Sequence, residues 1–206
     1  MFHKHAQHLS DVILGGQDGL VNVLGISIGV VAASADVSLV LLAGLSAMFA
    51  ESISMGAVAY TSTLAGLDYE RKMRLEAGMG RGEIEKVLGR LKGFGEKKMR
   101  FIRSRLLPAG EPGPSTLSAP YVKAIKVWLA CMAGSMVPLW PYFFLEVHQA
   151  APLSILSAAL VLFSTGALKA RWTVGDWRRS GAEMLLVGGL AALAGYVIGL
   201  LLRTPV

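Results

Sequence analysis

The chain of 206 residues is long enough for one or two soluble domains, but 53% of its residues are hydrophobic and only 17% are charged. Its mean hydropathy of +0.53 excludes an ordinary globular protein. The net charge of +6 does not indicate nucleic-acid binding, because the Lys and Arg residues lie beside long apolar segments, where membrane proteins collect positive charge. The single cysteine, Cys131, excludes an intrachain disulfide and says little about the redox compartment.

Five apolar segments are long enough to cross a bilayer as helices, which takes about 20 residues each. They cover approximately residues 12–33, 38–64, 124–145, 152–170 and 182–202. We therefore predict an all-α membrane protein with five transmembrane helices and a short cytoplasmic helical insertion between helices 2 and 3. Residues 1–66 hold helices 1 and 2 in this prediction, 67–120 the basic cytoplasmic loop, and 121–206 helices 3 to 5, within one membrane domain.

Positive charge falls almost entirely on one side of this topology. The N-terminus, the connections on that side and the segment ends that adjoin them hold nineteen of the 20 Lys and Arg residues, and Arg203 is on the other side. The positive-inside rule then places the N-terminus in the cytosol and the C-terminus outside or in a lumen. The short N-terminal segment without a transit or signal pattern favours a prokaryotic plasma membrane, with a vacuolar membrane as the alternative.

The loop between helices 2 and 3 is not a simple linker. Ile84, Val87, Leu88 and Leu91 have the spacing of one helical face, so residues 83–105 predict one or two short basic helices. We interpret their charged face as lying on anionic lipid headgroups.

Pairs of glycines four residues apart mark places where helices approach closely. They are Gly15/Gly19, Gly25/Gly29 and Gly195/Gly199. Such pairs serve internal packing about as often as dimerisation, so both interpretations are open at this point.

Glu51 is the most informative polar residue, because it lies near the middle of the second apolar segment. A carboxylate at that depth costs a few kcal/mol, which favours a functional role. Met48 and Met55 share its helical face, and one carboxylate with two thioethers suits a late first-row divalent metal better than magnesium or calcium. The structural alternatives are a protonated Glu51 bonded to a neighbouring helix and methionines that simply pack in the core.

Other polar residues permit two interpretations each. Asp18 and Asn22 share a face of the first segment, but Asp18 is equally consistent with a cap of a helix that begins at Gly19. Glu183 near the start of the fifth segment fits an interaction with the helix dipole. The N-terminal histidines are more typical of a solvated terminus than of a metal-collecting tail; they are His3, His5 and His8.

Short sequence motifs occur in all five apolar segments, in order along the chain. The first segment has Asp18-Gly-Leu-Val, and the second has Glu51-Ser-Ile-Ser-Met55-Gly followed by Tyr60-Thr-Ser. The third has Val137-Pro-Leu-Trp-Pro-Tyr142. The last two contribute Gly166-Ala-Leu-Lys169, Arg179-Ser-Gly-Ala-Glu-Met-Leu-Leu-Val-Gly188 and Tyr196-Val-Ile-Gly199. Together these motifs resemble the vacuolar iron transporter family.

The resemblance implies a dimeric five-helix metal/proton antiporter, with Asp18, Glu51 and Met55 as metal-pathway residues. This chain departs from the family at Val58-Ala59-Tyr60, where a further ligand is commonly found. It also lacks the family's E-x-x-E spacing in the cytoplasmic loop, which leaves Glu83 and Glu85 as weak candidates for a loop metal site.

We therefore predict a homodimeric transporter, not an enzyme, that exports iron(II) or manganese(II) from the cytosol by proton antiport. The predicted metal ligands are Asp18, Glu51, Met55 and Met48, with Glu51 also carrying the coupled proton. No permanently bound cofactor and no nucleic acid are expected; the partners are the metal ion, protons and lipid. The alternatives are a transporter of the same fold with another cargo, an intramembrane enzyme of the phospholipid-synthase kind, and a non-catalytic scaffold.

Overall fold

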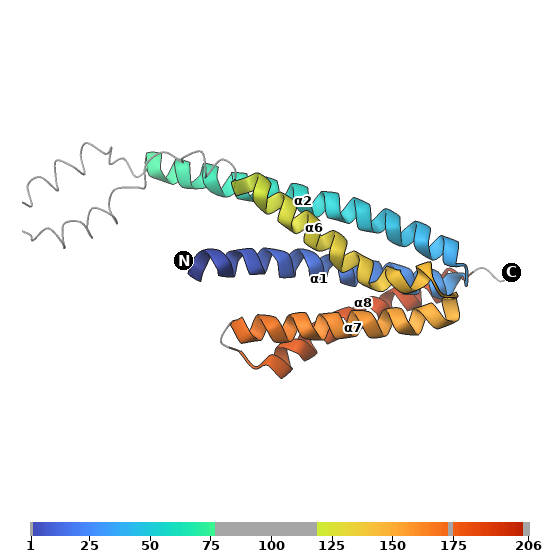
Figure 1. The fold of residues 1–206 in the computed structure, drawn as a ribbon. Coiled ribbons are helices and arrows are strands. Elements are labelled where there is room, and N and C mark those ends of the chain that lie inside the picture. The colour runs from blue at the N-terminus through green and yellow to red at the C-terminus, as the bar shows by residue number, and fades with distance from the viewer. Residues whose placement is uncertain (1, 77–118, 173–174, 204–206) are drawn as a thin grey trace, which may run out of the picture. The chain divides into compact units, whose positions relative to one another are not determined.

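Long helices account for nearly all of the structure, a computed structural model that describes residues 2–76, 119–172 and 175–203. In chain order they are α1 (Phe2–Ala33), α2 (Val37–Glu76), α6 (Ala119–Leu139), the short 3₁₀ helix η1 (Trp140–Phe143), α7 (Val147–Trp172) and α8 (Trp177–Leu201) (Figure 1). Within the described residues, five helices are long and apolar enough to cross a membrane. The predicted fold class is confirmed.

The chain divides into two compact units, which are considered separately. Unit 1 comprises residues 1–58 and 123–206, and unit 2 comprises residues 59–122. In unit 2, the rings of Tyr60 and Tyr121 lie 4.9 Å apart between centroids, and their hydroxyl oxygens are 3.3 Å apart. The predicted helices at residues 83–105 lie outside the described residues.

Proline and polar caps explain where the helices end. Asp36 Oδ1 accepts a hydrogen bond from the Ser38 backbone N–H at 2.8 Å, which caps the start of α2 after the tight turn that follows α1. The third span was predicted to reach Leu145, but α6 ends at Leu139 and continues as η1. Pro141 explains this difference, because its nitrogen has no hydrogen to donate and its ring disfavours the preceding helical turn.

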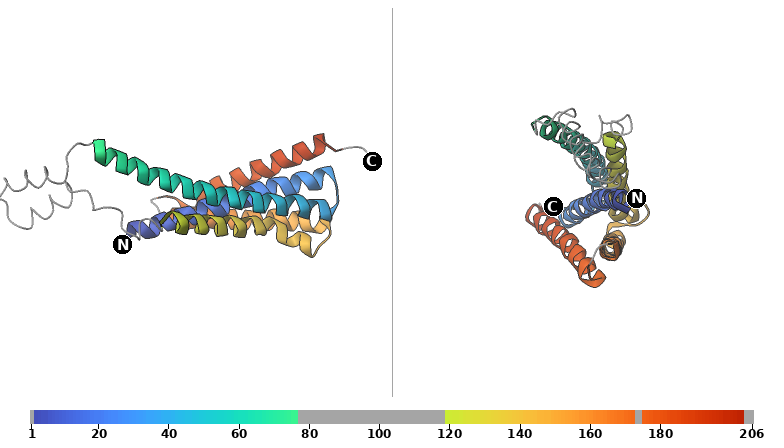
Figure 2. Two further views of the ribbon diagram at one scale, coloured as in Figure 1. Left: turned by 90° about the horizontal axis from the view of Figure 1, so that it is seen from above. Right: turned by 90° about the vertical axis from the view of Figure 1, so that its left-hand side faces the viewer.

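The glycine pairs of α1 and α8 pack against each other within one chain. An added Cβ at Gly195 would lie 1.9 Å from the carbonyl oxygen of Gly25, and one at Gly199 would lie 2.1 Å from that of Gly29. The two backbones are therefore in direct contact where α8 crosses α1 (Figure 2). Of the two interpretations of these glycines, internal packing is the one the structure supports.

A second close contact joins α1 to α6. An added Cβ at Gly134 would lie 1.9 Å from the carbonyl oxygen of Gly16, and one at Gly19 would lie 2.5 Å from that of Cys131. Within unit 1, α1 thus lies between α6 and α8 (Figure 1). Its buried apolar residues form the centre of the packing; they are Leu20, Val23, Leu24 and Ile28. This position fixes the polar residues of α1 relative to those of α2 and α6.

Candidate functional site

The side chain of Asn22 on α1 donates a hydrogen bond from Nδ2 to Oε1 of Glu51 on α2. Glu51 is half-buried and lies near the middle of the apolar span Val37–Tyr69. A carboxylate at this depth needs polar partners, because the hydrocarbon of a bilayer supplies none. Asn22 provides one such partner from another helix.

Asp18 lies one helical turn before Asn22 on α1, and its carboxyl group lies close enough to that of Glu51 for their charges to interact. Because α1 runs without a break from Phe2 to Ala33, Asp18 is inside a helix, and its alternative interpretation as an N-terminal cap is wrong. The structure thus brings two carboxyl groups together from two helices in an apolar region. Two neighbouring carboxylates repel each other unless they share a proton or a cation.

The two methionines differ in their surroundings. Met48 is only 2% exposed and packs in an apolar cluster with Val23 and Leu139, which agrees with its alternative role in core packing. Met55 is partly buried and lies one turn after Glu51 on α2. The structure therefore assembles Asp18, Asn22 and Glu51, while metal ligation by Met55 and Met48 stays a prediction.

The described residues contain no group of three His, Cys, Asp or Glu side chains that is arranged to hold a metal ion. The carboxylates of Asp18 and Glu51 offer two charged ligands, and Asn22 offers an amide oxygen. These three groups are an incomplete set of ligands for a divalent cation. Glu83 and Glu85, the weak candidates in the loop, lie outside the described residues. His3, His5 and His8 belong to the first turns of α1.

An open groove of about 430 Å³ runs between α1 and α8 beside this site. Asn22 lines it and is exposed, and the rest of the lining is apolar. Much of that lining comes from the small residues at the helix crossing, namely Gly25, Gly29, Ala191, Gly195 and Gly199. The polar pair Asn22–Glu51 therefore borders a surface of unit 1 that would face lipid in a single chain.

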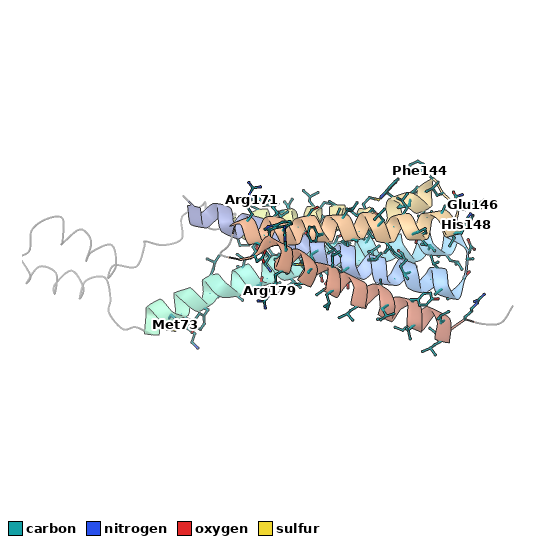
Figure 3. All side chains as sticks on the ribbon, turned by 90° about the horizontal axis from the view of Figure 1, so that it is seen from below. Met73, Phe144, Glu146, His148, Arg171 and Arg179 are labelled. Atoms are coloured by element: carbon teal, nitrogen blue, oxygen red, sulfur yellow. The ribbon has the colours of Figure 1, made fainter. Side chains whose placement is uncertain are left out.

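Two further features concern charged residues near the helix ends. Arg179 Nε pairs with Glu183 Oε1 at 3.1 Å on the first turns of α8, an i,i+4 ion pair that sequence analysis did not predict. Figure 3 shows Arg171 and Arg179 at one end of the α7–α8 hairpin and Glu146 and His148 at the other. The described part of unit 1 thus keeps the uneven charge distribution of the sequence.

Two further contacts depend on how the helices face each other and could not be predicted from the sequence. Asp11 on α1 pairs with Lys123 on α6, with 3.2 Å between Oδ1 and Nζ. The buried thiol of Cys131 lies beside Ser52 and Ser135 and close to the charge of Glu51. One signal was available, because Cys131 and Ser135 are four residues apart and must share a helical face.

Five membrane-spanning helices that carry two interacting carboxyl groups and an amide in their apolar part are typical of proteins that move ions across membranes rather than of passive anchors. The family profile described as the VIT family matches residues 9–200. The chain belongs to this family, which confirms the resemblance inferred from its motifs. The family and the named relatives are transporters, not enzymes.

Similarity to individual relatives extends over nearly the whole chain. Vacuolar iron transporter 1 of Oryza sativa subsp. japonica is 29% identical, with 94% of this chain and 89% of the relative covered. The vacuolar iron transporter of Plasmodium berghei is 24% identical, with 98% and 87% covered. Protein CCC1 of Saccharomyces cerevisiae is 26% identical, with 91% and 67% covered.

Proposed function

We propose that this protein transports a divalent metal ion, iron(II) or manganese(II), out of the cytosol in exchange for protons. The observation that carries the proposal is the hydrogen bond of Asn22 with Glu51 in the apolar part of the helices, together with the nearby carboxyl group of Asp18. The names of the relatives, vacuolar iron transporters from plants and Plasmodium, support iron as a cargo.

The carboxyl pair suits a divalent ion on grounds of charge. With both groups ionised, Asp18 and Glu51 contribute two negative charges, which offset the two positive charges of a partly dehydrated cation. Without the cation, this arrangement places two like charges in a medium of low dielectric constant, which is strongly unfavourable. Protonation of Glu51 relieves that repulsion, so Glu51 carries a proton in the return step and releases it when the next metal ion binds.

The preference among metals depends on the neutral donors. Carboxylate and amide oxygens suit manganese(II), iron(II) and harder ions alike, whereas a thioether favours the softer, later metals. Met55, one turn from Glu51, is the donor that selects against magnesium and calcium in this proposal. Met48 packs against Val23 and Leu139, so its role in this proposal is in helix packing rather than in metal binding.

The proposal includes a homodimer. Asn22 is exposed and borders the apolar groove between α1 and α8, so in a single chain the site would be open to the hydrocarbon of the bilayer. Polar groups in contact with lipid tails cost several kcal/mol each. A second copy that covers this face removes the contact with lipid and can complete the ligand set.

Transport is tested in sealed vesicles that contain the purified protein, with a metal-sensitive dye and a pH-sensitive dye inside. We expect manganese(II) or iron(II) to enter and protons to leave at proportional rates. Metal entry without proton movement would contradict antiport, and no entry of either metal would contradict the proposed cargo. Vesicles without protein are the control for leakage.

A further inference from the structure

A second polar cluster lies on the side of α6 that faces α1 and α2. Cys131 is fully buried, and its thiol lies beside the hydroxyls of Ser52 on α2 and Ser135 on α6. An added Cβ at Gly19 would lie 2.9 Å from Cys131 Sγ and 2.4 Å from Ser135 Oγ, so both atoms approach the same point of α1. Three helices therefore bring one thiol and two hydroxyls together in the apolar part of unit 1.

Apart from the Cys131 thiol beside them, the two serine hydroxyls have no partner among the described residues. Ser52 and Ser135 are completely buried, and neither makes a hydrogen bond of normal geometry with a described residue. Leaving a buried hydroxyl unpaired costs about 1–3 kcal/mol, and such groups in native proteins usually have a reason, such as an ion that they bind. Two of them around one thiol therefore indicate a ligand.

Charge indicates what kind of ligand this is. The Cys131 thiol lies within electrostatic range of both Glu51 and Asp18. A thiolate alone would add another negative charge to this region, whereas a thiolate that binds a divalent cation brings the local charge closer to neutral. A thiolate sulfur is also a soft donor, which binds Cd²⁺ and similar thiophilic ions in preference to manganese(II).

We propose that Cys131, Ser52 and Ser135 form a subsite for a thiophilic divalent cation such as Cd²⁺ beside the Asp18–Glu51 pair. On binding, the S–H bond breaks, its proton passes to water, and the sulfur donates its electron pair to the cation. The serine oxygens are the further ligands, and Glu51 supplies the second negative charge. The subsite rests on the proposed function only for the route by which the ion arrives.

The experiment titrates Cd²⁺ into the purified full-length protein in detergent and follows the ultraviolet absorption of the sulfur–cadmium bond. We expect this band in the wild type and its loss in Cys131→Ser, because Cys131 is the single cysteine of the chain. The double variant Ser52→Ala with Ser135→Ala keeps the thiol, and we expect it to weaken Cd²⁺ binding by about tenfold or more. Ser135→Ala alone serves if the double variant does not fold.

Each outcome bears on the proposal. A wild-type protein without the band would overturn it. Cadmium affinity that is unchanged in the serine variants would also overturn it, since Cys131 would then react as an isolated thiol. Because the readout does not involve transport, a protein that binds Cd²⁺ through Cys131 but moves neither manganese(II) nor iron(II) would contradict the proposed function and leave the subsite intact. Manganese transport without cadmium binding would overturn the subsite and leave the proposed function intact.

Discussion

Asn22 on α1 and Glu51 on α2 are joined by a hydrogen bond between their side chains, although 29 residues separate them in the sequence. The contact exists because α1 lies at the centre of unit 1 and presents Asp18 and Asn22, one turn apart, to α2. Since Gly15, Gly16 and Gly19 hold α1 against α6, a change in the packing of α1 must also move the polar residues it carries. The site and the helix packing are therefore coupled.

The first prediction tests this packing with two alanine substitutions on one helix. Gly195→Ala places a Cβ 1.9 Å from the Gly25 carbonyl oxygen, whereas Gly189→Ala meets no atom within 4 Å. Overpacking typically costs about 1–3 kcal/mol, while Gly→Ala at an unhindered helix position is neutral or stabilising. We expect Gly195→Ala to unfold at a clearly lower temperature in detergent and Gly189→Ala to match the wild type. Equal unfolding temperatures would contradict the α1–α8 contact.

The second prediction concerns the orientation in the membrane. Gln149 and Arg171 lie near opposite ends of α7, whose 26 residues are about 39 Å long and sufficient to cross a bilayer. In a Cys131→Ser background, we expect a cysteine introduced at Gln149 to react with an impermeant thiol reagent only from outside, and one at Arg171 only from the cytosol. Labelling of the Gln149 position from the cytosol would contradict the proposed orientation.

The sequence was sufficient to predict the number and approximate limits of the helices, because the hydropathy of each segment depends only on the residues that it contains. It did not predict the end of α6, where the prolines replace the last helical turn by η1. Nor did it identify the role of Asn22, because that role depends on which faces α1 and α2 turn toward each other, and hydropathy carries no such information. The glycine pairs left two interpretations open for the same reason, until the contact of Gly25 with Gly195 distinguished them.

The third prediction separates the two methionines that share the face of Glu51. Met48→Leu conserves volume within the cluster of Val23 and Leu139, so we expect a loss of less than about 1.5 kcal/mol in stability and normal metal affinity. Met55→Leu removes a donor beside Glu51, so we expect weaker binding and a changed preference between iron(II) and manganese(II). Thermal unfolding in detergent measures the stability of Met48→Leu, and metal competition in vesicles measures the metal affinity and preference of both variants. A loss of metal affinity that is larger in Met48→Leu than in Met55→Leu would show that Met48 is a ligand.

The fourth prediction concerns Glu51 itself. Glu51→Gln keeps the shape of the side chain and an oxygen that can accept the hydrogen bond from Asn22, but it removes the charge and the exchangeable proton. If Glu51 alternates between metal and proton, metal uptake and proton movement must fail together. Because a neutral amide is less costly to bury than a carboxylate next to Asp18, we expect the variant to insert and fold, with an unfolding temperature equal to or above that of the wild type.

The decisive measurement follows both dyes in the same vesicles for wild type, Glu51→Gln and Asp18→Asn. Asp18→Asn removes the other charge of the pair and leaves Glu51 able to carry a proton, so we expect weaker metal binding with the remaining metal flux still coupled to protons. Size-exclusion chromatography of each variant checks that a loss of transport is not a loss of folding. Metal transport by Glu51→Gln at the wild-type rate would show that Glu51 has a structural role, and the antiport mechanism would then be wrong even though the chain belongs to the family.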